Sequence, residues 1–456
     1  MTSSGSGART DSWTRTTLLA LLLVVLGQLL LSSDGHYTPE AIRWLAFAAV
    51  LGAVALAVPP HRLLERLGPC LPAGILLAGL VLQLGQVLTR PPGMYLRPTA
   101  GWSGFLFPVA AAAVLAGSLA FAGPRWARLG TALVALFFLA AGVWVLHASP
   151  RPVIDVFVFQ QQSSAALLRG QNPYAITFPN IYGHSPFYGP ELTDGRTLFF
   201  GFPYPPFSLV LAALGYLTAG DHRTAQLVAF AAGAACLLAL RPDRLGALTA
   251  ATFLLTPRGL FVLEQGWTEP FGVALLGLVL LAALHARRWL WLALGALLAW
   301  KQYAVVLLPL TALLVPRPFS WRALARLVLP ALAVAVAAAL PFLAWNAGAF
   351  WRSVVWLQTV QPFRADALSF PSALAALGVA PPPIVPTLLV LTALATGLVL
   401  WRAPRTPQGF ATGAMVVLGV FFAFNKQSFC NYWFLVLGAA ALAIPAIRLD
   451  STGEQC

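Results

Sequence analysis

Long apolar runs follow one another along almost the whole chain, and short polar segments between them hold most of the charged residues. Most runs have about 17–25 residues, the length that an α-helix needs to cross a hydrocarbon core about 30 Å thick. Only 9% of the residues are charged, against about 25% in a soluble domain. The sequence therefore predicts an all-α polytopic membrane protein and excludes a soluble enzyme, a secreted scaffold and a nucleic-acid-binding protein.

The runs predict a bundle of about 12–14 transmembrane helices. Five spans are expected in the first third, near residues 16–31, 42–58, 71–88, 102–122 and 129–147. The first of them is not followed by a small-x-small cleavage site, so it is interpreted as a span and not as a removed signal peptide. The later spans are expected near residues 224–240, 245–261, 270–284, 327–344, 384–401, 409–424 and 432–447. The shorter run 207–219 fits an interfacial or re-entrant helix.

The basic residues predict which way the chain enters the membrane, because cytoplasmic loops collect Arg and Lys. The net charge is +14, and arginines precede the first run and follow the second and fourth, at Arg9, Arg15, Arg62, Arg66, Arg125 and Arg128. This places the N-terminus inside and the long segment after the fifth run outside. Segment 346–382, between two later spans, is expected to be a second outside loop. The predicted organisation is therefore N-terminal transmembrane helices in 1–147, an extracytoplasmic loop in 148–206 and a C-terminal bundle in 207–456.

The apolar run 289–315 has a lysine near its middle, at Lys301. If the run were one span, Lys301 would lie at mid-bilayer and the arginines of segment 317–326 would lie outside. Two short helices that turn back at Lys301–Gln302 keep those arginines inside. Each half would be about 18 Å long, too short for the hydrocarbon core. The bend is therefore expected in a recessed cavity lined by protein, where irregular backbone is tolerated.

Asp155 stands directly after the fifth run, and a helix is expected from it to Arg169, ended by Gly170. One interpretation is structural, because aspartate suits the N-cap of a helix. The other is catalytic, because a carboxylate with a pKa near about 3.9 is ionised at neutral pH and can accept a proton from a hydroxyl. The sequence leaves both roles open.

The rest of the predicted outer loop is rich in Pro, Gly and Tyr, which predicts turns and extended segments. Two motifs stand out, Gly170-Gln-Asn-Pro-Tyr174 and Gly201-Phe-Pro-Tyr-Pro-Pro206. The loop tyrosines could stack on sugar rings or could lie in the aromatic belt at the membrane surface; they are Tyr174, Tyr182, Tyr188 and Tyr204.

Charged residues next to hydrocarbon are expensive and are candidates for a functional site. Glu264-Gln-Gly-Trp-Thr-Glu-Pro270 carries two carboxylates at a span junction, which would position a substrate or form a capped helix start. The chain has only two lysines, Lys301 and Lys426, and a glutamine follows each. A lysine is a compact charge that suits a phosphate, although lysines also extend towards the membrane surface from helix ends.

Several common motifs are absent from the sequence. There is no phosphate-loop lysine motif, no HExxH and no Gly-rich dinucleotide fingerprint. The cysteines have no CxxC spacing and no nearby histidine, so no metal site is predicted. Asp155 and Glu269 could hold a divalent cation, but no motif requires one. Since no soluble domain could hold a nucleotide sugar, an activated substrate would have to arrive through the lipid.

Together, these features resemble a known superfamily. Asp155 after a span, the two loop motifs, Glu264-Gln-Gly and Lys301-Gln302 are similar to features of the multi-spanning GT-C glycosyltransferases. Within them the chain most resembles the bacterial family 87 polyprenyl-phosphate-mannose-dependent mannosyltransferases. The resemblance covers residues 130–440. The spans before residue 129 depart from the commonest plan of the family, in which the catalytic aspartate follows the first span.

The resemblance implies a GT-C-like bundle with a large extracytoplasmic loop in a bacterial inner membrane. It implies transfer of a hexose, mannose in this family, from a polyprenyl-phosphate donor to a hydroxyl of a glycolipid or glycan acceptor, with inversion and without a nucleic-acid partner. Asp155 would be the base, and Lys301, with Lys426 or Arg258, would stabilise the departing lipid phosphate. The substrate-binding candidates are the polar residues of the region, namely Gln162, Asn172, Tyr174, Tyr204, Glu264, Gln265, Glu269 and Gln302.

Two other functions remain open at this point. A glycan ligase or polymerase that uses a lipid pyrophosphate would need a more arginine-rich outer site, for which Arg196, Arg223 and Arg258 are candidates. A transporter or lipid flippase would show internal repeats with paired broken helices. No inverted repeat is visible in the sequence, and the acidic residues gather at the predicted outer loop.

Overall fold

The computed structural model of the chain describes residues 12–447 apart from 98, 100, 122 and 184–186. The N-terminal helices are α1 (Trp13–Ser33), α2 (Pro39–Ala57), α3 (Arg62–Leu67), α4 (Cys70–Thr89), α5 (Ser103–Ser118), the 3-10 turn η1 (Leu119–Phe121) and α6 (Pro124–Ala148). The segment that follows contains α7 (Asp155–Leu168) and the short antiparallel strands β1 (Phe178–Pro179) and β2 (Thr197–Leu198). The predicted inside residue Arg9 lies outside the described residues.

The described chain from Pro206 to Ile447 is mostly helical. Its first elements are α8 (Pro206–Ala219), α9 (Arg223–Leu240), α10 (Arg244–Leu254), α11 (Gly259–Glu264), α12 (Glu269–His285), η2 (Arg287–Trp289), α13 (Leu290–Trp300) and η3 (Gln302–Leu314). The last are α14 (Trp321–Trp351), the π-helical turn η4 (Arg352–Trp356), α15 (Leu357–Val360), α16 (Phe370–Ala376), α17 (Ile384–Arg402), α18 (Pro407–Ala423) and α19 (Cys430–Ala443).

The helices confirm the predicted fold class at the level of an all-α protein whose helices suit a membrane. Within the described residues, six helices are long and apolar enough to cross a bilayer, and eight more apolar helices have 10–17 residues. The total of 12–14 spans stays a prediction. Helix starts follow the local sequence: Thr38 and Thr406 cap α2 and α18 with their side chains, and each is followed by a proline at the first helical turn.

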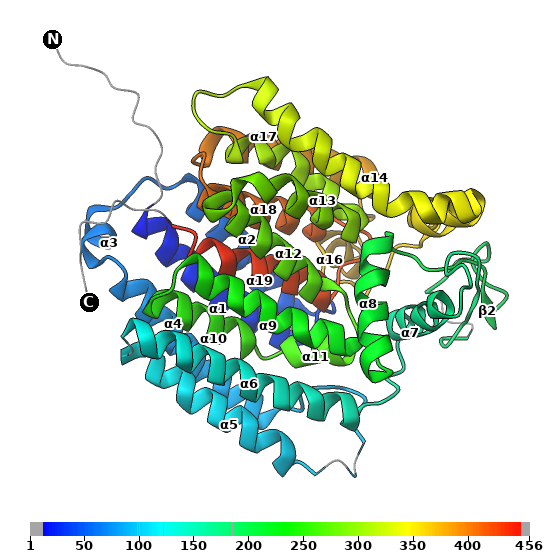
Figure 1. Ribbon diagram of the computed structural model, residues 1–456, viewed down its shortest axis with the longest axis horizontal. Coiled ribbons are helices and arrows are strands. Elements are labelled where there is room, and N and C mark those ends of the chain that lie inside the picture. The colour runs from blue at the N-terminus through cyan, green and yellow to red at the C-terminus, as the bar shows by residue number, and fades with distance from the viewer. Residues whose placement is uncertain (1–11, 98, 100, 122, 184–186, 448–456) are drawn as a thin grey trace.

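The core of the bundle is built around α1, α12 and α19, which lie side by side in the middle of the molecule (Figure 1). Small residues allow close approach there. A Cβ atom on Gly438 would meet the side chain of Val273 at 2.3 Å, and one on Gly277 would meet Cys236 at 2.7 Å. Close contact at small residues is the usual way in which helices associate inside a membrane.

The predicted bend at Lys301 is present. Lys301 has extended backbone angles between α13 and η3. Nη2 of Arg287, just before α13, donates to the carbonyl of Leu314 at the end of η3, at 2.6 Å. The start of α13 and the end of η3 therefore lie close together, and the chain turns back at Lys301 as expected.

Two predicted boundaries were wrong. The expected span 245–261 is broken between α10 and α11 at Pro257, because proline lacks the amide that a continuous helix needs. The expected outer loop 346–382 is largely helical, since α14 continues to Trp351 through a kink at Asn346 and passes into η4 and α15. Apolar content alone did not reveal that this helix continues into more polar sequence.

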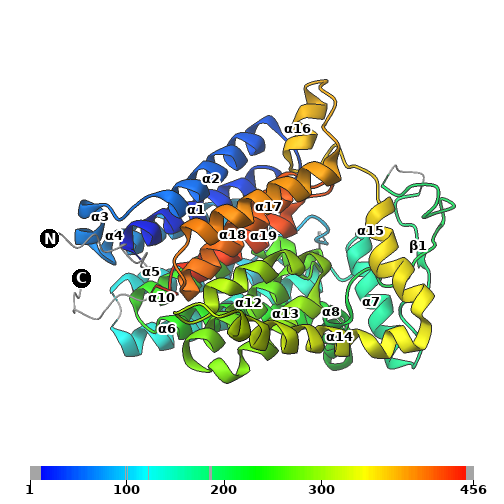
Figure 2. The same ribbon diagram turned by 90° about the horizontal axis from the view of Figure 1, so that it is seen from above.

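Several arginines lie at the end of the bundle where α1 begins. The guanidinium of Arg241 lies over the ring of Trp13, and Glu65 of α3 accepts hydrogen bonds from the first turn of α1. The guanidinium of Arg405 lies over Phe319. Figure 2 shows α3 and the start of α1 at one end and α7, β1 and α15 at the other. The arginine-rich turns 61–67 and 241–244 therefore lie at the end where α1 begins.

Candidate active site

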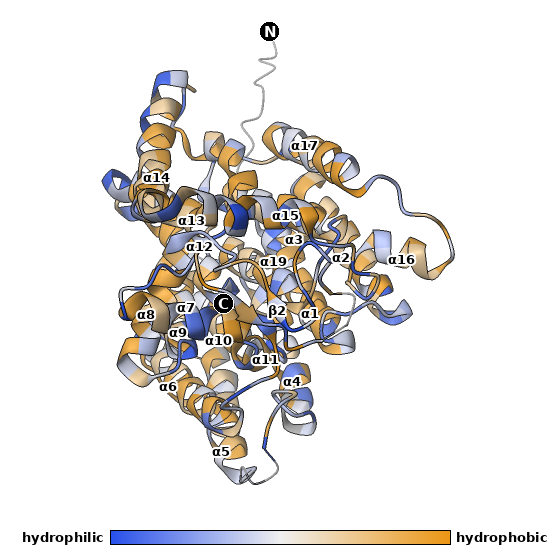
Figure 3. Cartoon of the chain, turned by 90° about the vertical axis from the view of Figure 1, so that its right-hand side faces the viewer, coloured by the Kyte–Doolittle hydropathy of each residue, from blue (hydrophilic) through white to orange (hydrophobic). Residues whose placement is uncertain are grey.

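A cavity of about 330 Å³ lies at the end of the bundle that carries α7. Its wall comes from parts of the chain that are far apart in sequence: the start of α7, the segment 182–204, the turn between α11 and α12, the segment 357–366 and the turn into α19. Figure 3 looks onto this end of the molecule, where polar loops lie among the apolar helices. The cavity is thus built where loops from both halves of the bundle meet.

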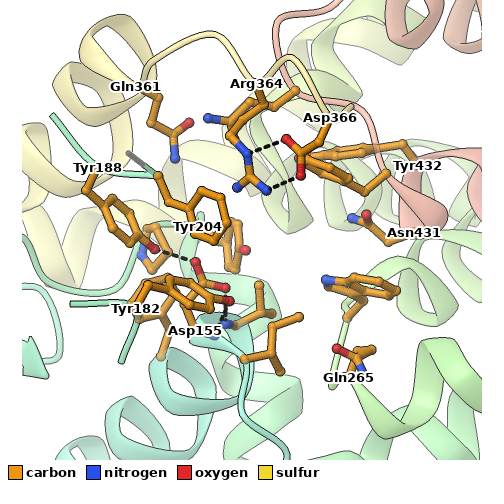
Figure 4. Close-up of a pocket in the computed structure, with 18 of the residues that line it drawn as sticks. Asp155, Tyr182, Tyr188, Tyr204, Gln265, Gln361, Arg364, Asp366, Asn431 and Tyr432 are labelled. Atoms are coloured by element: carbon orange, nitrogen blue, oxygen red, sulfur yellow. Dashed lines mark hydrogen bonds and ion pairs between the residues drawn. The ribbon is translucent and has the colours of Figure 1, made fainter. Parts of the chain in front are cut away.

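Asp155 lies on one side of this cavity (Figure 4). It is the first residue of α7, and Ile154 occupies the N-cap position. One carboxylate oxygen accepts a hydrogen bond from the amide of Val156 at 2.7 Å, and the other accepts one from the hydroxyl of Tyr188. The hydroxyl of Tyr182 accepts a hydrogen bond from the Asp155 amide at 3.3 Å. Asp155 is therefore not the N-cap but a half-buried carboxylate held from two sides.

The environment of Asp155 changes its acidity. Burial raises the pKa of this carboxyl above its ordinary value, although the hydrogen bonds from Tyr188 and Val156 and the charge of Arg364 oppose the shift. A carboxylate with a raised pKa is a stronger base than an ordinary aspartate. The geometry fixes the carboxylate on the cavity wall, and the burial makes it more ready to take a proton.

Arg364 and Asp366 form the opposite side of the cavity (Figure 4). Nε and Nη2 of Arg364 donate to the two carboxylate oxygens of Asp366, each at 2.7 Å. The guanidinium lies 3.7 Å from the ring centre of Phe187 and 4.9 Å from that of Phe429. Burial raises the pKa of Asp366, but the hydrogen bonds and charge of Arg364 lower it overall. Within the described chain, Nη1 of Arg364 makes no hydrogen bond to protein.

Arg364 was not among the site residues predicted from the sequence. The available signal was an arginine and an aspartate two positions apart in the predicted outer loop, which is weak because many surface loops contain such pairs. Its place in the cavity depends on tertiary contacts. The amide of Arg364 donates to the carbonyl of Lys426 at 3.0 Å, which ties this segment to the turn before α19.

Lys426 was predicted to bind phosphate, but in the structure its ammonium group donates to backbone carbonyls. Its Nζ donates to the carbonyls of Gln358 at 2.8 Å and Gln361 at 2.7 Å, close to the C-terminus of α15. Both glutamines line the cavity, whereas Lys426 does not. The lysine therefore holds the segment that carries Arg364.

Lys301 and Glu269 form a buried ion pair beneath the cavity wall. The paired oxygen of Glu269 also accepts hydrogen bonds from the hydroxyl of Tyr303 at 2.9 Å and from Nδ2 of Asn431 at 2.8 Å. The Nζ of Lys301 lies 4.8 Å from the ring centre of Tyr204. Tyr204 and Asn431 line the cavity, while Lys301 and Glu269 lie behind them.

Arg258 and Glu264 hold the loop between α4 and α5. Arg258 pairs with Asp34 at the end of α1 and donates to the carbonyl of Pro91 at 3.1 Å. The carboxylate of Glu264 accepts hydrogen bonds from the amides of Met94 and Tyr95, at 2.6 and 2.8 Å. Met94 and Tyr95 line the cavity, and neither Arg258 nor Glu264 does.

Three other predicted substrate-binding residues, Gln302, Tyr174 and Asn172, also lie outside the cavity lining. Nε2 of Gln302 donates to the carbonyls of Pro203 and Val354, at 2.8 and 3.0 Å. Tyr174 is buried and donates to the carbonyl of Tyr204 at 2.9 Å, and Asn172 accepts a hydrogen bond from the Tyr174 amide at 3.0 Å.

Gln162 lies on the outer side of α7, away from the cavity. Of the predicted site residues, the cavity lining contains Asp155, Tyr204 and Gln265. The structure brings these three together and places the others behind the wall or outside it.

The residues around the cavity bear on two other possibilities, a metal site and an arginine-rich site for a pyrophosphate. Within the described residues, no group of three or more His, Cys, Asp or Glu is placed to hold a metal ion. Arg223 is buried, pairs with Asp221 and donates to the carbonyls of Ser149 and Glu264. Arg223, Arg258 and Arg196 do not line the cavity, so its lining contains one arginine, Arg364.

No protein-family model, curated protein or solved structure matches this chain. The functional conclusion therefore depends on the geometry and chemistry of the cavity.

Proposed function

We propose that this protein is a membrane glycosyltransferase of the GT-C type, which moves a hexose, mannose by resemblance, from a polyprenyl-phosphate donor to an acceptor hydroxyl. The observation that carries the proposal is the half-buried Asp155 carboxylate on the wall of a cavity at the loop-bearing end of an apolar helix bundle. The cavity volume of about 330 Å³ lies at the lower end of the range for small-ligand sites, which suits a single sugar ring.

In the proposed reaction the acceptor oxygen attacks the anomeric carbon of the donor sugar. The bond between that carbon and the phosphate oxygen breaks, and the lipid phosphate leaves with the electron pair. The proton of the acceptor hydroxyl passes to Asp155, which later releases it to water. A single displacement of this kind inverts the anomeric centre. The raised pKa of Asp155 favours the proton transfer.

We assign the leaving phosphate to Arg364. Its Nη1 is the edge of the guanidinium that Asp366 leaves free among the described residues, and a guanidinium is a strong donor to phosphate oxygens. The sequence had suggested Lys301, Lys426 and Arg258, but each of them is bound to other protein groups and none lines the cavity. A lining with one arginine favours a donor with one phosphate over a pyrophosphate donor.

We place the cavity on the extracytoplasmic side of a bacterial inner membrane. The support is the distribution of arginines, which gather in the turns at the other end of the bundle. A donor that is anchored in the outer leaflet by its lipid could then present its sugar to the cavity, and a glycolipid or glycan acceptor could reach the same cavity from water.

The test replaces Asp155 and compares envelope glycans. The gene is deleted and restored as wild type, Asp155→Asn or Asp194→Asn, and glycolipids and glycans are analysed by mass spectrometry. Asp194 is the matched control, because it is an exposed carboxylate in the same loop that accepts amide hydrogen bonds and lies outside the cavity. The expected result is a product that lacks one hexose in the deletion and Asp155→Asn strains alone.

A second variant tests the phosphate assignment. Arg364→Gln should lower the transfer rate by about 10²–10³-fold, the usual cost of removing one donor that stabilises a developing negative charge. Arg196 is an exposed arginine outside the cavity, so Arg196→Gln should leave the rate unchanged.

If Asp155→Asn keeps the wild-type glycan profile, the assignment of Asp155 as the base is wrong. A transporter or a ligase then becomes the better interpretation.

A further inference from the structure

A second concave surface lies on the outside of the same loop region. One hollow of about 380 Å³ lies between α7 and α8, and an adjoining hollow of about 710 Å³ lies between β2 and the end of α14. Thr177 lines both hollows, so they form one continuous surface. We call this surface the outer groove; its lining includes Gln162, Thr177, Glu191, Phe199, Trp351, Arg352 and Trp356.

Aromatic side chains form one part of the outer groove. Trp351 is 61% exposed and Phe199 is 38% exposed, and Trp356 beside them is half-buried. Their flat, apolar faces suit the C–H faces of sugar rings, and the indole N–H of a tryptophan can donate a hydrogen bond.

Several polar side chains of the outer groove have no protein partner among the described residues. Gln162, Thr177, Glu191 and Arg352 are exposed, and within the described chain none of these side chains makes a hydrogen bond or an ion pair. Together with Arg169, which lines the same surface and donates to Gln171 at 3.5 Å, they supply donors and acceptors, with one negative and two positive charges. Side chains that both donate and accept match the hydroxyl groups of a carbohydrate, which do the same.

The outer groove lies directly behind the candidate active site. Phe199 lines the groove and Phe200 lines the cavity, and likewise Trp356 lines the groove and Leu357 the cavity. After its kink at Asn346, the end of α14 stands beside β1 and α7 (Figure 2). The two sites therefore occupy opposite sides of the same short segments.

We infer that the outer groove binds a carbohydrate chain of several hexose units, and that it holds the part of a glycan acceptor that extends away from the reacting sugar. The binding rests on the groove alone, whereas its use for an acceptor rests on the proposed function. The combined hollows are larger than the cavity at Asp155, as a chain of several units would require.

The test measures binding by full-length protein in nanodiscs of phosphatidylcholine. The probes are linear tetraoses of mannose and of glucose, with free mannose as the single-unit control, and the method is isothermal titration calorimetry. We expect one of the tetraoses to bind to wild type and to Asp155→Asn with similar Kd, and free mannose to bind much more weakly. Trp351→Ala and Gln162→Ala should each raise the Kd by about tenfold.

Trp345→Ala is the matched control. Trp345 is 48% exposed on the same helix and lies outside the groove, so the variant should keep the wild-type Kd. The inference is overturned if neither tetraose binds, or if binding survives Trp351→Ala. It is also overturned if brominated phosphatidylcholine quenches wild type more than Trp351→Phe, since the ring would then lie among acyl chains. Tetraose binding without any sugar transfer would leave the groove standing and remove the proposed function.

Discussion

At the scale of single residues, the proposed base gives a pH dependence with a defined sign. Asp155 must be ionised to accept a proton, and its raised pKa moves the acid limb of the rate profile above the ordinary range of an aspartate. The hydrogen bond from Tyr188 lowers this pKa, so Tyr188→Phe should shift the acid limb to higher pH. Tyr182→Phe, whose effect on Asp155 is smaller, should shift it less. Transfer rates across pH check both, and an unchanged limb in Tyr188→Phe would contradict the assignment.

The same raised pKa predicts how stability responds to replacement of Asp155. A carboxyl whose pKa is higher in the folded than in the unfolded state destabilises the fold when it is ionised, that is, at neutral pH. Asp155→Asn should therefore have a thermal midpoint equal to or above that of wild type near pH 7. The difference should vanish as the pH falls through the ordinary aspartate pKa, because both proteins are then neutral at this position. A lower midpoint for the variant at pH 7 would argue for a structural role.

At the scale of elements, the Glu269–Lys301 pair joins α12, the α13–η3 bend and α19, through Asn431. Removing one member leaves a buried charge without its partner, which costs about 3–5 kcal/mol. Glu269→Gln should therefore destabilise the protein by about that amount and disturb Tyr204 and the cavity. Glu269→Gln combined with Lys301→Met should recover most of the loss. Unfolding measurements on the single and double variants check this, and simple additivity would show that the two side chains do not act as a pair.

Much of the arrangement of helices could be predicted from the sequence. Apolar runs gave most of the long helices, and the arginines after residue 315 required the bend at Lys301. The helix from Asp155, ended at Gly170, also followed from local signals. The cavity could not be assembled in the same way. Contacts between segments that are far apart in sequence decide where each cation lies. Lys426 therefore supports a loop, whereas Arg364 lines the cavity wall.

At the scale of the whole molecule, the first two helices take part in the candidate site. The amide of Tyr37, in the turn between α1 and α2, donates to the carbonyl of Asp366 at 2.9 Å, and His36 packs against Phe429 and lines the cavity. Arg258 pairs with Asp34 at the end of α1. The N-terminal spans that depart from the commonest plan of the resembled family are therefore part of the wall that carries Arg364 and Asp366.

The charge of the molecule predicts its orientation in the membrane, and two matched substitutions test this prediction. Arg196 lies in the loop at the cavity end, and Arg66 lies on α3 at the arginine-rich end; both are exposed. In a background without native cysteines, Arg196→Cys should react with a membrane-impermeant thiol reagent added to intact spheroplasts. Arg66→Cys should react only after the membrane is opened, because its end of the bundle is predicted to be cytoplasmic. The reverse pattern would place the cavity inside the cell, where a donor anchored in the outer leaflet could not reach Asp155.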